Sequence, residues 1–242
     1  MTKAYKRLSQ VYDSGWSDFS RQYVDWINGL LAERGIVKGK ILDLACGTGT
    51  LALELAQCGH IVQGIDISVE MIEKAKSKSA RLPNVSFDVQ DMTRFEIDAQ
   101  FNLIACTFDS INYIRNLNLV RRMLSRVGSV LDEAGLFIFD TNTKRLYQSH
   151  SNETVSRMLN GQTFYQHCRY DSIRNVAITT FSFSDGTLEI HRQWPYDYDD
   201  LSPILISSGL HIVQLFSWFD MIPYSPEAAK IFCVAEKNSE TV

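Results

Sequence analysis

The sequence lacks the features that cross-link a chain or anchor it in a membrane. Its five cysteines are an odd number without a Cys-x-x-Cys pair, which argues against a disulfide framework and a zinc cage. No apolar run approaches the ~18 residues of a membrane span, and the first residues are polar rather than the apolar core of a leader. We therefore expect a soluble, cytoplasmic protein with no leader, no metal and no membrane partner.

Positive charge is also scarce. The chain has 24 Lys and Arg against 28 Asp and Glu, a formal net charge of −4, and no block of basic residues. Binding to nucleic acid depends on neutralising phosphates, so this balance argues against a nucleic-acid partner. Repeats and Pro/Gly-rich linkers are missing as well, while 45% of the 242 residues are hydrophobic. The composition indicates one globular α/β domain, which we expect to be a monomer or homodimer.

The first 140 residues alternate between strand-like and helix-like segments. Buried strands are expected at 40–44, 60–65, 85–89, 101–106 and 136–139, and helical patterns separate most of them. Such alternation indicates right-handed crossovers and a Rossmann-like, mostly parallel sheet that is covered on both faces.

The pattern changes after residue 140. Three extended segments follow at 164–170, 176–183 and 187–194, which predicts an antiparallel meander, and two closing strands are expected at 211–218 and 231–236. We expect one domain over 1–242, with a core at 37–145 and 196–242 and the meander, 146–195, covering the active site. Residues 1–36 are predicted to form a helical cap on the sheet, from the helical spacing of Tyr5, Tyr12, Phe19, Tyr23, Trp26 and Leu30.

A glycine loop follows the first strand. Gly47 and Gly49 stand between a strand and a helix, where glycine permits positive φ and the helix N-terminus offers free N–H groups. The spacing Gly47-x-Gly49-x-x-Ala52, with Asp66 about 20 residues beyond the loop, also fits a dinucleotide fingerprint. The loop pattern alone therefore leaves a nicotinamide-dependent oxidoreductase open.

Three acids at or just after strand ends favour a different ligand. Asp43 would repel a pyrophosphate but attract an ammonium group, and S-adenosylmethionine carries an ammonium, a sulfonium and no phosphate. Asp66 and Asp91 follow the next two strands, where they could meet the ribose hydroxyls and the adenine amine. The alternative is that Asp43 serves a turn and that Asp91 caps a helix.

These residues resemble the class I S-adenosylmethionine-dependent methyltransferases. The resemblance rests on 43–49, on 64–68 with Met71, and on Asp91-Met92. More locally, 108–113, 135–143 and the pair Tyr12-Asp13 resemble a bacterial small-molecule subgroup. The resemblance implies sheet order 3-2-1-4-5-7-6 with strand 7 antiparallel, conversion of S-adenosylmethionine to S-adenosylhomocysteine, and a small-molecule acceptor. Its implied cofactor-binding residues are Tyr12, Asp43, Ala45, Cys46, Gly47, Gly49, Asp66, Ile67, Met71, Asp91, Met92 and Thr107.

One position departs from the family, which often has glycine where this chain has Ala45. Because small residues commonly replace that glycine, we expect a slightly less flexible loop and no loss of binding.

The expected reaction is direct in-line displacement of the methyl group by an O, N or C nucleophile of the acceptor. Alignment supplies much of the rate in such a reaction, so a general base is useful but not obligatory. For that base we rank His191 first and His167 second, both on predicted meander strands, against the alternative of structural histidines. Asp109 is a further candidate beside acceptor or cofactor, unless it only caps its turn.

Other residues have weaker interpretations. The rings of Tyr12, Phe108 and Tyr113 could stabilise the sulfonium charge as it disperses. Arg192 could bind an acidic substrate or could simply be exposed on its strand. Asp197, Asp199 and Asp200 are expected to begin a helix rather than bind a metal.

Two other classes of protein stay open. An oxidoreductase fits the glycine spacing, although the chain has no Tyr-x-x-x-Lys pair, and a non-enzymatic scaffold could retain the fold. Methylation of nucleic acid is less favoured, because Thr107-Phe108-Asp109 stands where adenine amino-methylases have Asn/Asp-Pro-Pro-Tyr.

Overall fold

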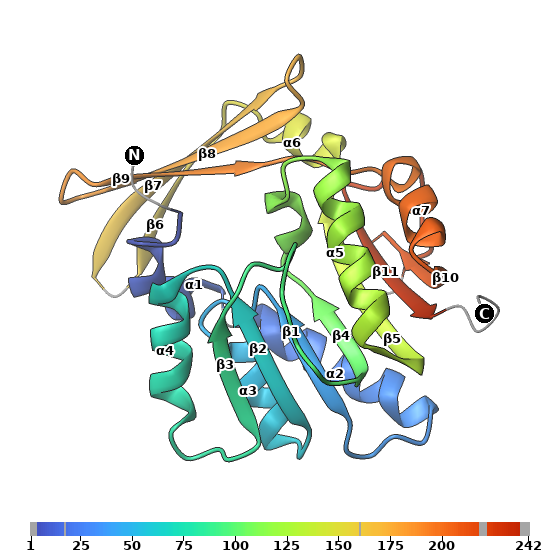
Figure 1. Cartoon of the computed structure of the whole chain (residues 1–242). Coiled ribbons are helices and arrows are strands. Elements are labelled where there is room, and N and C mark those ends of the chain that lie inside the picture. Colours follow the sequence, from blue (N-terminus) through green and yellow to red (C-terminus); the bar gives the residue numbers. More distant parts are fainter. Residues whose placement is uncertain (1–3, 17, 160, 218–221, 238–242) are drawn as a thin grey trace.

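The protein combines two sheets of different kinds (Figure 1). The computed structural model describes residues 4–16, 18–159, 161–217 and 222–237. Within these residues, a seven-stranded sheet carries helices on both faces, and a four-stranded antiparallel sheet lies across one end of it. The mixed α/β, Rossmann-like fold confirms the class predicted from the sequence.

The large sheet has the order β10-β11-β5-β4-β1-β2-β3. β11 runs antiparallel to both of its neighbours, β5 and β10, and the other pairings are parallel. This is the predicted order, with β10 and β11 as the sixth and seventh strands of the sheet. Its strands are β1 (Lys40–Leu44), β2 (Ile61–Asp66), β3 (Val85–Val89), β4 (Phe101–Cys106), β5 (Leu131–Asn142), β10 (Leu210–Phe216) and β11 (Lys230–Lys237).

Two apolar clusters fill the two faces of this sheet. Alternate residues of one strand point to opposite faces, so Ile41 packs with α2, α3 and α4 while Leu42 packs with α5 and α7. Ser68 accepts a hydrogen bond from the N–H of Met71 and so caps α4, as its position predicts. The helices of this part are α2 (Asp18–Glu33), α3 (Thr50–Gln57), α4 (Val69–Ser79), α5 (Leu117–Val130), α6 (Lys144–Ser149) and α7 (Tyr198–Ser207).

The smaller sheet, which we call the meander, has four strands where the sequence predicted three. Its order is β6-β7-β8-β9, all antiparallel, with β6 (Thr154–Leu159), β7 (Gln162–Asp171), β8 (Val176–Phe183) and β9 (Leu188–Gln193). The additional strand, β6, lies at the edge of the sheet and is largely exposed. An edge strand with no buried face lacks the apolar alternation by which strands are found in a sequence.

The N-terminal residues divide between two roles. Tyr23 and Leu30 of α2 are buried against the large sheet, as the cap prediction requires. Residues 4–16, which include the 3-10 helix η1 (Leu8–Gln10) and α1 (Tyr12–Trp16), instead lie under the meander, so for them the prediction of a cap on the sheet is wrong (Figure 1). The side chains of Phe19 and Trp218 lie outside the described residues. In the part of the chain that is described, no helix combines the length and apolar character needed to cross a membrane.

Candidate active site

The glycine loop turns sharply between β1 and α3. Gly47 and Gly49 have φ of 55° and 78°, in the left-handed region that favours glycine. A Cβ on Gly49 would lie only 2.6 Å from the ring of Phe87, so close packing also demands glycine there. Ala45 has φ of 57°, also in the left-handed region, where glycine would be less strained than alanine.

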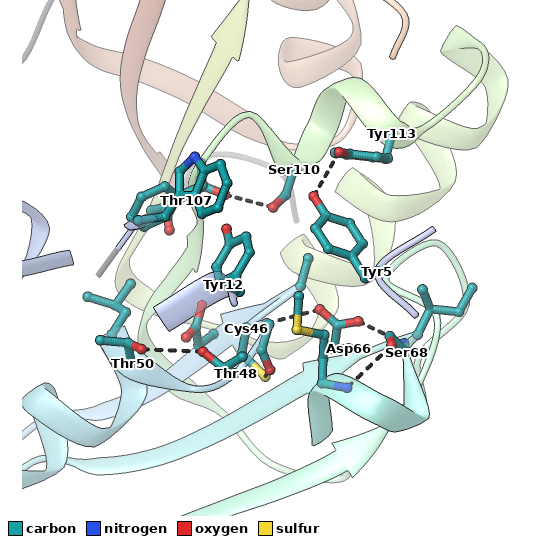
Figure 2. A pocket seen from close by; sticks show the side chains of 18 of the residues that line it. Tyr5, Tyr12, Cys46, Thr48, Thr50, Asp66, Ser68, Thr107, Ser110 and Tyr113 are labelled. Atoms are coloured by element: carbon teal, nitrogen blue, oxygen red, sulfur yellow. Dashed lines mark hydrogen bonds between the residues drawn. The ribbon is translucent and has the colours of Figure 1, made fainter. Parts of the chain in front are cut away.

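Asp66 ends β2 and holds this loop in shape. Its Oδ2 accepts a hydrogen bond from the N–H of Gly47 at 2.9 Å, and its Oδ1 accepts one from the N–H of Ser68 at 2.7 Å (Figure 2). These two backbone N–H groups orient both oxygens of the Asp66 carboxylate. Asp66 is therefore fixed at the cavity, where the resemblance predicts the ribose hydroxyls.

Asp43, on β1, is buried with only 2% of its surface exposed. Among the described residues its Oδ2 has no hydrogen-bond partner. Burial, with a smaller contribution from the charge of Asp66, raises the pKa of Asp43 to about 8. A buried carboxylate with an unpartnered oxygen suits the ammonium group of S-adenosylmethionine.

A first cavity of about 310 Å³ opens above the loop. Ten of the twelve cofactor-site candidates line it: Tyr12, Asp43, Ala45, Cys46, Gly47, Asp66, Ile67, Met71, Met92 and Thr107. Gly49 shapes the turn without lining the cavity, and Asp91 lies next to it. The predicted residues are thus brought together, with an acid on one side and largely apolar walls on the other.

Asp91 lines a third cavity that shares Asp66 and Met92 with the first. Its Oδ1 accepts hydrogen bonds from the N–H and the hydroxyl of Thr93, both at 2.8 Å, and its Oδ2 pairs with Arg94 at 3.2 Å. Asp91 therefore holds a turn and does not cap a helix, as the alternative interpretation had it, and it lies beside the first cavity.

A second cavity, also of about 310 Å³, lies between the first and the meander. Five aromatic residues line both cavities and form a shared wall: Tyr5, Tyr12, Trp16, Phe108 and Tyr113. Figure 2 shows the rings of Tyr5 and Tyr12 pointing into this region. A group bound in the first cavity thus faces the second across aromatic rings.

His191 lies in the wall of the second cavity and is 2% exposed. Its Nδ1 lies 2.8 Å from the hydroxyl of Tyr113, and its Nε2 lies 2.7 Å from Oε1 of Glu189. His167 is instead exposed on β7, where it contacts Thr154, and is not among the residues that line the cavities. Of the two histidine candidates, only His191 reaches the site.

Asp109 also lines the second cavity, but its carboxylate is already engaged. Gln193 donates to Oδ2, and the ammonium of Lys230 lies 3.4 Å from Oδ1 and 2.5 Å from Oδ2 of Asp140. Burial raises the pKa of Asp109 although Lys230 acts to lower it. The structure therefore places Asp109 at the second cavity as part of a charge cluster.

The remaining weak candidates lie outside the cavities. Arg192 is exposed on β9, as the simpler interpretation holds. Asp197 and Asp200 form a capping box at the start of α7, which confirms the predicted helix start.

Sequence reasoning missed two residues that organise the site and left a third unexplained. Glu189 is fully buried beside His191, and its position two residues earlier on the same strand face was a usable signal. Tyr5 was assigned to the helical cap. Asp13, quoted only as half of the Tyr-Asp pair, joins α1 to the glycine loop by accepting from Thr48, and to α4 by pairing with Lys78 at 2.8 Å.

The comparisons with known proteins agree with this geometry. Residues 41–135 match the family model described as a methyltransferase domain. A protein of Bacillus subtilis named as the methyltransferase YqeM is 27% identical over 98% of this chain and 99% of its own length. A ubiquinone biosynthesis O-methyltransferase of Coxiella burnetii is 32% identical over 62% of this chain and 64% of its own.

Solved structures show the same fold. An S-adenosylmethionine-dependent methyltransferase of Clostridium acetobutylicum has a TM-score of 0.84 at 24% identity, covering 97% of this chain and 99% of its own. CalS10 of Micromonospora echinaspora, an amino pentose methyltransferase with S-adenosylmethionine bound, has a TM-score of 0.70 at 17% identity over 98% of each chain. The matched methyltransferase domain, the full-length relative and the cavity that Asp43 and Asp66 line together support a class I S-adenosylmethionine-dependent methyltransferase.

Proposed function

We propose that this enzyme methylates an O, N or C nucleophile of a small molecule bound in the second cavity. The observation that carries the proposal is the aromatic wall shared by the two cavities. S-adenosylmethionine supplies a methyl group activated by its sulfonium. Tyr12, Phe108 and Tyr113 present rings to that charge and exclude water, so that an acceptor on the far side can meet the methyl group in line.

The charges of the second cavity indicate which acceptors it takes. Its described lining includes the carboxylates of Asp109 and Glu153 and the rings of His150 and His191, but no Lys or Arg side chain. The nearby Lys230 is paired with Asp109 and Asp140. A methyl acceptor that carries a carboxylate or phosphate would meet the negative charge of these acids, with no cation in the described lining to pair with it. A neutral or basic acceptor is therefore favoured.

The names of similar proteins support a small-molecule acceptor but point to different kinds of molecule. One is named as an O-methyltransferase of ubiquinone biosynthesis and another as an amino pentose methyltransferase. A nucleic-acid acceptor is disfavoured by the net charge of −4. We further propose one domain, with a core at 37–145 and 196–242 that the meander covers, a cytoplasmic location, and a monomer or homodimer.

Calorimetric titration tests the cofactor assignment. S-adenosylhomocysteine should bind and NAD should not, and Asp66→Ala should weaken S-adenosylhomocysteine binding by roughly 100-fold, since charge-assisted hydrogen bonds to two hydroxyls are lost. Asp88→Ala, which removes an exposed carboxylate from β3, is the matched control and should bind as the wild type does. Tight binding of NAD alone, or an unchanged affinity in Asp66→Ala, would contradict the proposal.

An acceptor panel tests the substrate class. Transfer of labelled methyl from S-adenosylmethionine should occur to hydroxyl- or amine-bearing compounds and should fall when a carboxylate or phosphate is added to the same skeleton. Preference for the anionic member of such pairs would contradict the assignment of the second cavity.

A further inference from the structure

A single buried carboxylate joins the N-terminal residues to the meander. Glu189, on β9, has no exposed surface. Its Oε1 accepts the N–H of Tyr5 at 2.8 Å, and its Oε2 accepts the N–H groups of Arg7 and Leu8 at 2.6 Å and 3.2 Å. Nε2 of His191 also lies within hydrogen-bond distance of Oε1, so four N–H groups surround this carboxylate. Residues 4–16, which we call the N-terminal cover, are held over both cavities in this way.

Ionised Glu189 fits this environment. Burial acts to raise the pKa of Glu189, but the hydrogen bonds from His191 and from the N–H groups of Arg7 and Leu8 outweigh burial and hold the pKa below its ordinary value. The backbone of Tyr5 has φ of 65°, in the left-handed region, so this residue is held in a conformation that it would rarely adopt unaided.

The carboxylate also decides how the neutral imidazole of His191 is protonated. A carboxylate only accepts, so Nε2 must carry the hydrogen and Nδ1 must accept from the hydroxyl of Tyr113. The Tyr113 oxygen then accepts from the hydroxyl of Tyr5 at 2.7 Å, the bond drawn in Figure 2. The chain of hydrogen bonds therefore runs in one direction, from Tyr5 to Tyr113 to His191 to Glu189.

The rings around His191 keep it in this place. Tyr5 and Phe181 make edge contacts with the imidazole at centroid distances of 4.6 Å and 4.9 Å, and Tyr113 does so at 5.9 Å. Tyr5 and Tyr113 line both cavities, whereas His191 lines only the second and is almost fully buried. The hydroxyl of Tyr5 is thus the open end of the chain.

We propose that Glu189 is a positioning residue that fixes the Nε2–H form of His191 and holds Tyr5 in place, so that Tyr5, Tyr113 and His191 carry away a proton of the acceptor. This inference rests on the proposed function. The acceptor's proton passes to the Tyr5 oxygen as the Tyr5 proton passes to Tyr113 and the Tyr113 proton passes to Nδ1. Each oxygen gains one O–H bond and loses one, and the positive charge on His191 faces the negative charge of Glu189.

The tyrosines serve as a path and not as the final base. Burial raises the pKa of both Tyr5 and Tyr113 well above the ordinary value, so a phenolate at either position is costly. The imidazole is the first group along the chain that can keep the proton beside an opposite charge. This assigns the base role of His191 to a buried group that acts through two hydroxyls.

Histidine nitrogen NMR tests the proposal without an identified acceptor. With ¹⁵N-labelled histidine and S-adenosylhomocysteine at pH 8.5, well above the ordinary histidine pKa, His191 should show the Nε2–H pattern. In Glu189→Gln the side-chain amide has one acceptor oxygen and one donor NH2 group. The NH2 group must face either the ring of His191 or the backbone N–H groups of residues 4–16. We expect a switch of His191 to Nδ1–H, hydrogen exchange at least about tenfold faster in residues 4–16, and S-adenosylhomocysteine binding weaker by about tenfold.

Two further variants separate this role from a merely structural one. Glu133→Gln makes the same change at an exposed position of β5 and should leave all three measurements unaltered. Tyr113→Phe should keep the Nε2–H form and the slow exchange of the cover, because the ring of His191 is still held by Glu189.

The proposal is overturned if His191 of the wild type carries its hydrogen on Nδ1, or if Glu189→Gln keeps the Nε2–H form and the slow exchange. Should Glu189→Gln not fold, the wild-type tautomer and Tyr113→Phe decide. Failure of the proposed function would look different, because the wild type would then not bind S-adenosylhomocysteine or would prefer the anionic member of the acceptor pairs, whatever the tautomer of His191.

Discussion

The three acids at the ligand edge of the sheet differ in their hydrogen-bond partners, and these decide what each can do. Asp66 accepts hydrogen bonds from two backbone N–H groups, which fix both of its oxygens. Asp91 is tied to Thr93 and Arg94. Asp43 alone of the three is buried with an oxygen that no described residue partners. Asp43 therefore has the most to gain from a bound cation.

Binding of the cofactor's amino-acid portion should release a proton at mildly acidic pH. The pKa of Asp43 is about 8 in the free protein, so at pH 6.5 the carboxyl is protonated. An ammonium beside it favours the ionised form, so binding should expel about one proton, and affinity should rise about tenfold per pH unit from pH 6.5 to 7.5. Calorimetry of S-adenosylhomocysteine in buffers of different ionisation enthalpy measures the release.

Matched variants identify the source of that proton. Asp43→Asn should abolish the release and bind about 30-fold more weakly at pH 7.5, since it cannot supply the charge. Asp88→Asn, an exposed acid on β3, should release the proton as the wild type does. A heat of binding that is independent of the buffer in the wild type would show that Asp43 does not meet the ammonium.

Single residues could be predicted where a motif within a few residues fixes their role, and could not where the role comes from a contact with a distant part of the chain. The acids and glycines were found because strand ends and a tight turn fix them within a few residues. Tyr5 and Glu189 are joined across 184 positions by a hydrogen bond, and nothing local in the sequence encodes that pairing. The left-handed φ of Ala45 could not be predicted locally, because alanine gives no signal of a positive φ.

At the scale of elements, the turn after β4 shows how the sheet positions residues that line the second cavity. Phe108 and Asp109 both have left-handed backbones, with φ of 59° and 49°. The N–H of Asp109 donates to Oδ2 of Asp140 on β5 at 2.8 Å, and Lys230 of β11 bridges the two acids. Tyr23 of α2 donates to the other oxygen of Asp140 at 2.6 Å. Four elements thus meet at one buried cluster that holds a strained turn in place.

Removing the cation of this cluster should be strongly destabilising. Lys230→Met leaves the fully buried Asp140 without its opposite charge, which should lower the free energy of unfolding by about 3–5 kcal/mol. Adding Asp140→Asn should restore part of that loss. Urea unfolding measures both, with Lys144→Met as the control, because its pair with Asp197 is exposed and worth less than about 1 kcal/mol. If Lys230→Met costs no more than Lys144→Met, the cluster does not hold this turn.

The strands of the large sheet were predictable and the edge strand of the meander was not, for one reason. Strands β1, β4 and β5 are buried on both faces and form apolar runs between polar segments. β6 buries little, and its place comes only from pairing with β7. Pairing between strands is a tertiary property, so a single sequence shows it only when a buried face marks the strand.

At the scale of the whole molecule, the site is covered by segments from two distant parts of the chain. The N-terminal cover and the meander lie side by side (Figure 1). They share a small apolar cluster that is separate from the two clusters of the large sheet and contains Leu8, Val11, Phe164, Phe181 and Phe183. A separate cluster can loosen without unfolding the rest. The arrangement therefore suits an enzyme whose cofactor and acceptor must enter under a cover.

Loosening that cluster should open the cover and leave the core intact. Leu8 is 3% exposed, and Leu8→Ala should remove about 2–4 kcal/mol of local stability. Hydrogen exchange in residues 4–16 should become faster and S-adenosylhomocysteine binding about tenfold weaker, while the urea midpoint of the core stays near that of the wild type. Leu44→Ala, in a cluster of the large sheet, is the control and should lower that midpoint. If Leu8→Ala instead lowers the midpoint as much as Leu44→Ala and leaves the exchange of the cover unchanged, then cover and core unfold as one unit and the ligands must enter by another route.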